Sequence, residues 1–272
     1  MSESDDLEIP ADDEPIRFEM VGDVAVLVLD DPPLNLFTER TFHAMGAARD
    51  QVASSGARAM VFRAEGKVFT GGVDVGKVFK DVAGSAEGTR LARDGIEQLQ
   101  AFERLEMPTL ALVHGLCLTA GLEAALGCDM IWAAEGSRFG LVERVVGLTP
   151  FGGGVQRMAE RAGPARAREF VMTGGLYDAE KMLEWGVVNR VVAPEDLVEK
   201  GMKFAAQLAA GPTVAHAATK RIVRAYLDGG IEAADAAVPQ IAGPLFDTED
   251  LKGAVESFLT DGPGNYTDYK GK

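Results

Sequence analysis

The chain has 272 residues, of which 47% are hydrophobic and 25% are charged, a composition typical of a soluble globular protein with a sizeable core. Its formal net charge of −15 argues against nucleic acid and against anionic membrane surfaces, because both bind proteins through cationic contacts. The sequence has no apolar run near the roughly 18 residues that a membrane-spanning helix needs, so we expect no membrane association.

Residues 1–15 are acidic and lack the basic-then-apolar order of a targeting peptide. They predict a disordered tail on a cytoplasmic protein. Cys117 and Cys128 stand in apolar stretches without metal-ligand spacing, which predicts two reduced, buried thiols and no metal site.

The first half of the chain alternates between strand and helix patterns. Residues 16–30 alternate in polarity around a Gly-Asp turn and predict a β-hairpin. The other expected elements, in chain order, are a helix over 38–53 capped by Thr38, a strand over 57–64, a helix over 88–106, a strand over 109–115, a helix over 120–127 and a strand over 129–134. This order predicts α/β layers with right-handed crossovers.

From about residue 155 the pattern becomes mainly helical. Apart from a strand over 187–192, the expected helices span 153–162, 164–172, 178–185, 195–209, 212–227, 231–242 and 248–259. We therefore divide the chain into an α/β core over 16–200 and a helical region over 201–272. Because the second piece is small for a core of its own, we expect it to pack on the main body or on another subunit.

Two carboxylates stand in apolar surroundings. Glu123 lies near the start of the helix over 120–127, where it either complements the helix dipole from the surface or faces inward to a site. Glu143 lies in an apolar loop, where it either pairs with Arg144 on the surface or faces inward. The local sequence leaves both alternatives open.

Two glycine-rich stretches accompany these carboxylates. Gly71 and Gly72 precede Val73, and they form either an ordinary turn or a site where a backbone N–H is free for an anion. The run Gly152–Gly154 opens another helix and resembles a phosphate cradle only weakly, because it lacks the Lys-Ser/Thr ending of a P-loop. Free N–H groups are thus available at Val73 and at the first turn of the helix over 120–127, where backbone N–H groups have no internal partner. Together with the two carboxylates, they are suited to moving a proton next to a carbonyl group.

Five segments, taken in order, connect these features to a known family. They are DPPLNLFT (31–38), GKVFTGGVDV (66–75), VHGLCLTAGLEAALGCDM (113–130), SRFGLVERVVGLTPFGGGVQRM (137–158) and DTEDLKGAVESFL (247–259). Their sequence and order resemble the enoyl-CoA hydratase/isomerase (crotonase) superfamily over about residues 16–266. The resemblance implies an α/β fold, a crotonase-like spiral of β-β-α units with a helical C-terminal trimerisation region, and hence a homotrimer or a hexamer of two trimers.

The resemblance also implies a site for an acyl-CoA thioester, with no metal and no cofactor other than the coenzyme A of the substrate. Glu123 and Glu143 match the two catalytic glutamates of the hydratases, and the N–H groups of Val73 and Ala120 match the oxyanion hole. Further acyl-CoA contacts are expected at Leu36, Lys67, Gly72, Asp74, Val75, Gly76, Lys77 and Gly121.

Because both glutamates are present, the resemblance favours an enoyl-CoA hydratase, a hydro-lyase that forms 3-hydroxyacyl-CoA from trans-2-enoyl-CoA. The alternatives are a double-bond isomerase, which needs only the match to Glu143, and a catalytically silent CoA-binding protein. Several positions depart from the family pattern. Thr119–Ala120 stands where the family has a Gly-Gly pair, Val73 stands where it has Ala, and Phe151 stands where it has Gly. In addition, Arg144 follows Glu143, and residues 258–266 lack the family's basic pair. If Arg144 faces Glu143, it lowers the pKa of that carboxyl.

Overall fold

The computed structural model describes residues 14–272, so residues 1–13 of the predicted tail lie outside the described residues. Its centre is a six-stranded sheet in the order β1-β2-β3-β4-β6-β9. The strands are β1 (Ile16–Val21), β2 (Val24–Leu29), β3 (Ala59–Ala64), β4 (Thr109–Val113), β6 (Met130–Ala134) and β9 (Arg190–Val192). β1 and β2 are antiparallel, as the predicted hairpin requires, and the remaining pairs are parallel.

A second, three-stranded sheet begins with the strand that follows β4 in the chain. It consists of β5 (Leu116–Leu118), β7 (Arg138–Gly140) and β8 (Tyr177–Asp178). β7 pairs in parallel with β5 and antiparallel with β8. The sequence analysis missed all three strands, because two or three residues are too few to establish an alternating pattern.

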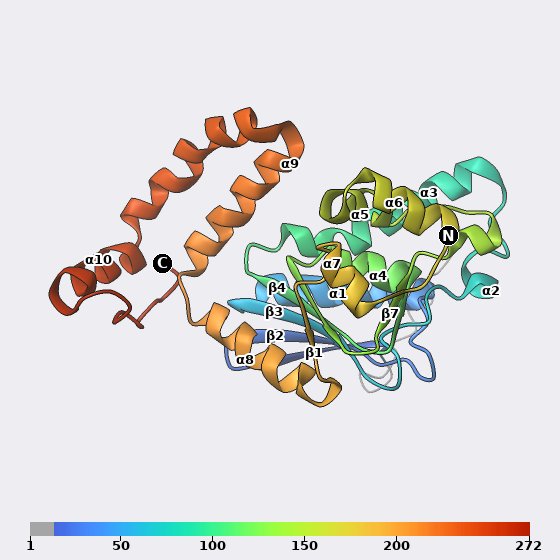
Figure 1. Cartoon of the computed structure of the whole chain (residues 1–272), viewed down its shortest axis with the longest axis horizontal. Coiled ribbons are helices and arrows are strands. Elements are labelled where there is room, and N and C mark those ends of the chain that lie inside the picture. Colours follow the sequence, from blue (N-terminus) through green and yellow to red (C-terminus); the bar gives the residue numbers. More distant parts are fainter. Residues whose placement is uncertain (1–13) are drawn as a thin grey trace, which may run out of the picture.

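Helices cover both faces of the large sheet (Figure 1). β2 and β4 are buried along their whole length, which explains their continuous apolar sequences. On one face lie α1 (Glu39–Ser54), which Thr38 caps as predicted, α3 (Gly84–Leu99) and α4 (Thr119–Leu126). The other face is covered by α8 (Leu197–Ala209), where Leu197 packs into a core with Leu110 and Trp132.

The remaining short helices connect the strands or follow them. They are α2 (Val75–Val78), α5 (Gly154–Ala162), α6 (Pro164–Thr173) and α7 (Ala179–Glu184). Cys117 and Cys128 are free and fully buried in the core, so their predicted burial is confirmed. Within residues 14–272, none of the helices combines the length and the apolar character that a bilayer crossing requires.

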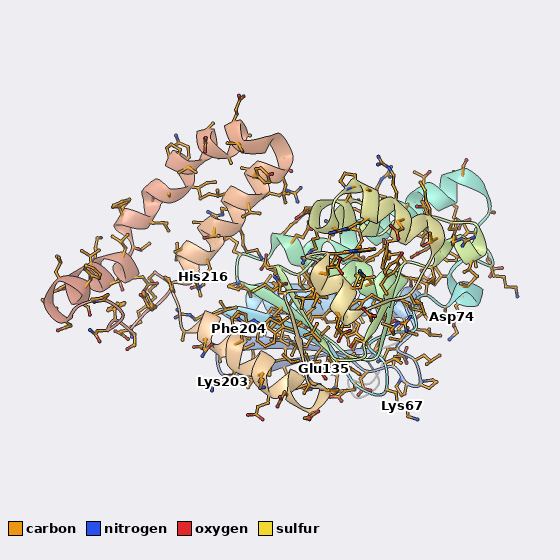
Figure 2. All side chains as sticks on the ribbon, in the orientation of Figure 1. Lys67, Asp74, Glu135, Lys203, Phe204 and His216 are labelled. Atoms are coloured by element: carbon orange, nitrogen blue, oxygen red, sulfur yellow. The ribbon has the colours of Figure 1, made fainter. Side chains whose placement is uncertain are left out.

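The C-terminal helices extend away from the core (Figure 1). The two helices expected over 212–227 and 231–242 form one element, α9 (Thr213–Ala242), with a kink at Gly230 where φ is 75°. α10 (Glu249–Asp261) follows it. Figure 2 shows that side chains along α9 and α10 project from an extended helical arm, whereas those between the sheet and its covering helices are densely packed. The boundary expected near residue 200 falls within α8, which packs on the sheet.

Candidate active site

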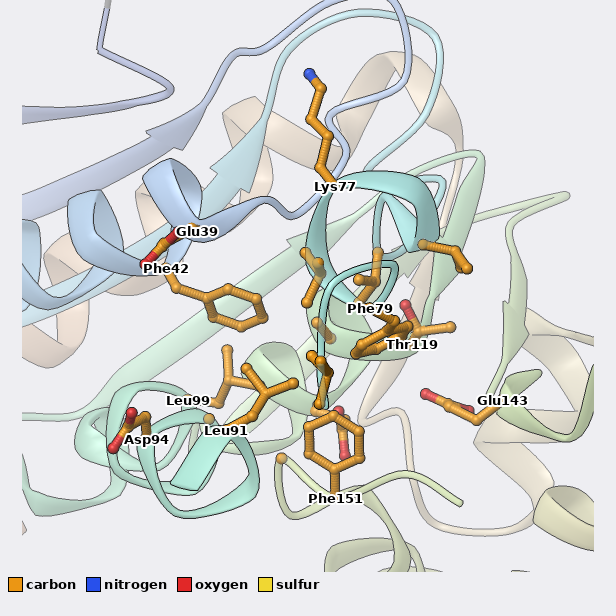
Figure 3. A pocket seen from close by; sticks show the side chains of 18 of the residues that line it. Glu39, Phe42, Lys77, Phe79, Leu91, Asp94, Leu99, Thr119, Glu143 and Phe151 are labelled. Carbon is orange, nitrogen blue, oxygen red and sulfur yellow. The ribbon is translucent and has the colours of Figure 1, made fainter. Parts of the chain in front are cut away.

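A cavity of about 610 Å³ lies among α1, α2, α3, α4 and the loop that precedes α5 (Figure 3). Much of its wall is apolar. The larger apolar side chains that line it are Phe42, Phe79, Leu91, Leu99, Val142 and Phe151. Glu123, Glu143 and Thr119 also line it, so the two carboxylates that the sequence analysis singled out belong to one cavity.

Glu123 faces inward. α4 is buried on all sides, so it has no solvated face on which a carboxylate could lie, and Glu123 is only 5% exposed. Its Oε1 accepts a 2.9 Å hydrogen bond from the N–H of Gly154, the first residue of α5. The surface alternative for Glu123 is therefore wrong.

The glycine run before α5 leaves room for this carboxylate. A Cβ on Gly152 would stand 2.7 Å from Oε2 of Glu123, and one on Gly154 would stand 2.9 Å from its Cγ. Gly153 adopts a φ of 111°, and its carbonyl oxygen accepts a hydrogen bond from the buried Arg157. The run thus holds a carboxylate of the protein itself, in place of the phosphate that a cradle would bind.

Glu143 also faces inward and has fewer partners. It begins a short 3-10 helix after β7, is buried, and its Oε2 has no hydrogen-bond partner within the described residues. The guanidinium group of Arg144 turns away, donating a 2.7 Å hydrogen bond to the carbonyl oxygen of Thr173. The expected effects of Arg144 on Glu143, a surface pair or a lowered pKa, are thus both wrong.

Both carboxyls hold protons more tightly than an exposed glutamate does. Burial raises the pKa of Glu123 to about 7, against the opposing effects of the N–H groups of Gly154 and Gly152 and the charge of Arg157. Burial also raises the pKa of Glu143 to about 7, against the opposing effect of its own backbone N–H and with a smaller contribution from the charge of Glu123. The charge of Glu123 thus disfavours a second charge on Glu143, which favours a state in which the pair holds one proton.

Val73 and Ala120, whose N–H groups are the expected oxyanion donors, both line the same cavity. Phe37 pairs with Val73 as in a parallel sheet: its N–H donates to the carbonyl oxygen of Gly72, and its carbonyl oxygen accepts from the N–H of Asp74. In such a pairing the N–H of Val73 points away from Phe37. Ala120 is the second residue of α4, where helix N–H groups have no internal partner. In the described part of the chain, neither N–H donates to another backbone group.

The other expected contact residues divide into two groups. Val75 and Lys77 line the cavity, together with Val73, Ala120 and the two glutamates. The rest do not line it: these are Leu36, Lys67, Gly72, Asp74, Gly76 and Gly121. Asp74 instead caps α2 by accepting from the N–H of Lys77, and Figure 2 shows Lys67 and Asp74 at the same end of the molecule.

Sequence reasoning missed most of the apolar lining. Phe42 on α1, Phe79 after α2 and Leu91 on α3 come from separate elements, and no local pattern distinguishes them from core residues. Thr119 and Phe151 did carry a signal, because each departs from the glycine that the resemblance leads one to expect.

Comparisons with known proteins bear on the family and the fold of the chain. A family model described as enoyl-CoA hydratase/isomerase matches residues 19–269. The chain is 34% identical over 223 residues to a carnitinyl-CoA dehydratase of Salmonella arizonae, covering 80% of this chain and 84% of that protein. It is 30% identical over 247 residues to a short-chain-enoyl-CoA hydratase of Clostridium acetobutylicum, covering 90% and 94%. The chain also superposes on the crystal structure of an enoyl-CoA hydratase of Mycobacterium smegmatis, with a TM-score of 0.84 and 27% identity. The match covers 91% of this chain and 96% of that one. The predicted fold class is confirmed.

Proposed function

The chain belongs to the enoyl-CoA hydratase/isomerase family, and on that premise we propose that it adds water to a trans-2-enoyl-CoA to give a 3-hydroxyacyl-CoA. The observation that carries this proposal is the pairing of Glu123 and Glu143, two buried carboxyls with pKa values of about 7 in one cavity. Hydration needs one group to take a proton from water and another to give a proton to carbon, and such a pair supplies both.

The thioester oxygen would accept hydrogen bonds from the N–H groups of Val73 and Ala120. When water attacks C3 of the double bond, negative charge moves onto this oxygen as an enolate, and donors that are already in place stabilise it without reorganisation. The acyl chain would then run along the apolar wall of the cavity.

The environments of the two glutamates suggest their roles. Glu123 has the N–H of Gly154 as a donor, and Arg157 also favours its ionised form, whereas Oε2 of Glu143 has no partner in the described residues. The single proton of the pair would therefore reside mainly on Glu143. In this assignment Glu123 accepts a proton from the attacking water, and Glu143 delivers its proton to C2. The proton on Glu123 then returns to Glu143, which restores the pair. No metal or redox cofactor enters these steps, and coenzyme A is part of the substrate.

The test is the loss of the enoyl-thioester absorbance with four-carbon and ten-carbon trans-2-enoyl-CoA. The wild-type chain should turn over, and Glu123→Ala and Glu143→Ala should each lower kcat by about 100-fold or more. Glu135→Ala, which removes an exposed carboxylate, serves as the control and should retain the wild-type rate. If a 3-enoyl-CoA were isomerised by wild type and by Glu123→Ala alike, the protein would be a double-bond isomerase. If thioesters bound without any reaction, it would be a CoA-binding protein.

We further propose that the chain assembles as a homotrimer or as a hexamer of two trimers. The support is the extended arm of α9 and α10, which carries large exposed apolar side chains. These are Val223, Tyr226, Leu227, Ile231, Val238, Phe246, Val255, Phe258 and Leu259. Apolar surface of this kind is characteristic of contacts between subunits.

Light scattering of the purified protein measures the mass directly. Ile231→Asp combined with Leu259→Asp should reduce the mass toward that of one chain, because each change places a charge on a contact surface. Lys203→Asp on α8 is the matched control. A wild-type chain that is monomeric at working concentration would contradict the assembly.

A further inference from the structure

Thr119, the first residue of α4, has an unusual backbone conformation. Its φ of 46° lies in the left-handed region. A β-branched residue is a genuine outlier there, because its Cβ and branches crowd the neighbouring backbone. Strain of this kind is found mainly at active sites and ligand clamps, where the surrounding structure holds it in place.

The side chain of Thr119 has a second unfavourable feature. The residue is 7% exposed, and its Oγ1 is buried without a hydrogen-bond partner within the described residues. A buried hydroxyl that lacks a partner destabilises the folded state. Serine would relieve the crowding by the methyl branch, and glycine would remove both the crowding and the unpaired hydroxyl. Because two unfavourable features meet at one residue of the cavity wall, we look for one cause of both.

The position of the hydroxyl supplies that cause. Thr119 directly precedes Ala120, and its Oγ1 lies 2.5 Å from the point where a Cβ on Gly72 would stand. Gly72 directly precedes Val73. The hydroxyl therefore lies where the two chain segments that carry the free N–H groups approach each other, and Figure 3 shows Thr119 among the side chains that line the cavity.

We propose that the hydroxyl of Thr119 is a third hydrogen-bond donor to the thioester oxygen, beside the N–H groups of Val73 and Ala120. This inference rests on the proposed function. The hydroxyl rotates about its Cβ–Oγ1 bond and has no competing acceptor among the described residues, so it can donate to an oxygen held between the two N–H groups. Its hydrogen bond strengthens as the oxygen becomes an enolate, which makes Thr119 a catalytic residue that lowers the barrier more than it tightens substrate binding.

A purely structural role is the competing explanation, because the methyl group of Thr119 lies against Gly72. Three substitutions separate the two roles. Thr119→Val keeps the shape and the branching but removes the hydroxyl. Thr119→Ser keeps the hydroxyl but removes the methyl group. Thr119→Gly removes both and relieves the backbone strain, so it should fold even where Val disturbs packing.

The experiment measures kcat and KM for enoyl-CoA hydration in all four proteins, with melting temperature as the check on folding. Thr119→Val and Thr119→Gly should lower kcat by about 100-fold, with a smaller change in KM, and Thr119→Ser should restore most of the loss. The inference is overturned if Val or Gly retains the wild-type kcat, or if Ser loses as much as Val, because packing would then account for the effect.

A second measurement keeps this test separate from the proposed function. An aryl-substituted enoyl-CoA absorbs at longer wavelength when hydrogen bonds polarise its carbonyl group, and this shift requires binding without turnover. The wild-type and Thr119→Ser proteins should produce a larger red shift than Thr119→Val. If wild type hydrates no enoyl-CoA but the shift still depends on the hydroxyl, the proposed function fails while the third donor stands. Equal shifts in wild type and Thr119→Val would overturn the third donor.

Discussion

The N–H of Gly154 donates a 2.9 Å hydrogen bond to Oε1 of Glu123, and this contact joins the start of α5 to the middle of α4. Because Gly154 is the first residue of α5, the positive end of that helix dipole faces the carboxylate. The contact favours the ionised form of Glu123 against the effect of burial. Oε2 of Glu143, in contrast, has no hydrogen-bond partner within the described residues.

Substitution of Gly154 tests whether this contact sets the activity. In Gly154→Ala the new Cβ would stand 2.9 Å from Cγ of Glu123 and 3.0 Å from Cδ1 of Leu141, so the carboxylate must move. We expect a loss of about 1–3 kcal/mol in the free energy of unfolding and a kcat at least about tenfold lower, measured by urea unfolding and enoyl-CoA hydration.

The matched control for Gly154→Ala is Gly88→Ala. Gly88 lies in α3, and a Cβ there would meet no atom within 4 Å. This change should leave kcat unaltered and raise stability by up to about 1 kcal/mol, because alanine favours a helix. A wild-type kcat in Gly154→Ala would show that the contact does not position Glu123 for the reaction.

The burial of Glu123 also predicts a pH-dependent stability. Its pKa is about 7 in the folded chain and near the ordinary 4.5 when unfolded, so the folded state binds more protons between these values. The stability that this group contributes is therefore greatest below about pH 4.5 and is lost as the pH rises through about 7. Relative to wild type, Glu123→Gln should gain roughly 3 kcal/mol at pH 8 and little at pH 4.5, because one pKa unit corresponds to about 1.4 kcal/mol.

Urea unfolding at both pH values measures this difference. Glu135→Gln, at an exposed carboxylate, is the control for the loss of one charge. If Glu123→Gln had the same effect on stability at both pH values, the carboxyl of Glu123 would not be held in a protonated form by burial.

The sequence predicted most of the large elements, because their patterns are local. β2 and β4 are continuous apolar runs, α1 has its capping residue Thr38, and α9 ends its first part at a glycine. What it missed were strands of two or three residues, β5, β7 and β8, which exist through their pairing with one another. Such pairing depends on residues that are 22 to 40 positions apart, so a local pattern does not contain it.

The candidate site was predictable in its residues but not in their surroundings. The sequence identified Glu123 as a carboxylate among apolar neighbours, yet its direction depends on the hydrogen bond from Gly154, the first residue of α5, 31 positions further on. The glycine run resembled a phosphate-binding loop weakly. The sequence does not reveal that the carboxylate of Glu123 occupies the space next to Gly152. Arg144 follows Glu143 in sequence, but its guanidinium group contacts Thr173 instead.

The coupling of the two glutamates predicts a bell-shaped dependence of kcat on pH. Because the charge of Glu123 raises the pKa of Glu143, we expect the pair to titrate in two steps, with the singly protonated state between them. We expect maximal kcat near neutral pH with a fall on both sides, measured at saturating substrate between about pH 5 and 9. Removal of one partner, as in Glu123→Gln, should abolish the acidic limb in whatever activity remains. A wild-type kcat that is flat across this range would contradict a reaction that needs one proton on the pair.

Phe151 should limit the length of the acyl chain. It comes from the loop before α5, its ring contacts that of Phe79 edge-on at 6.0 Å between centroids, and it faces Gly95 of α3. This side chain thus joins three segments of the cavity wall (Figure 3). Its removal in Phe151→Ala should lengthen the apolar space that is open to substrate.

The measured quantity is kcat/KM for a ten-carbon enoyl-CoA divided by that for a four-carbon one. We expect Phe151→Ala to raise this ratio by about tenfold, because each added methylene that gains an apolar contact contributes roughly 1 kcal/mol or more to discrimination. Phe204→Ala is the control, since Phe204 stacks on Trp132 on the far face of the sheet and should affect stability alone. An unchanged ratio in a folded Phe151→Ala protein would place the end of the acyl chain elsewhere in the cavity, beyond the reach of this ring.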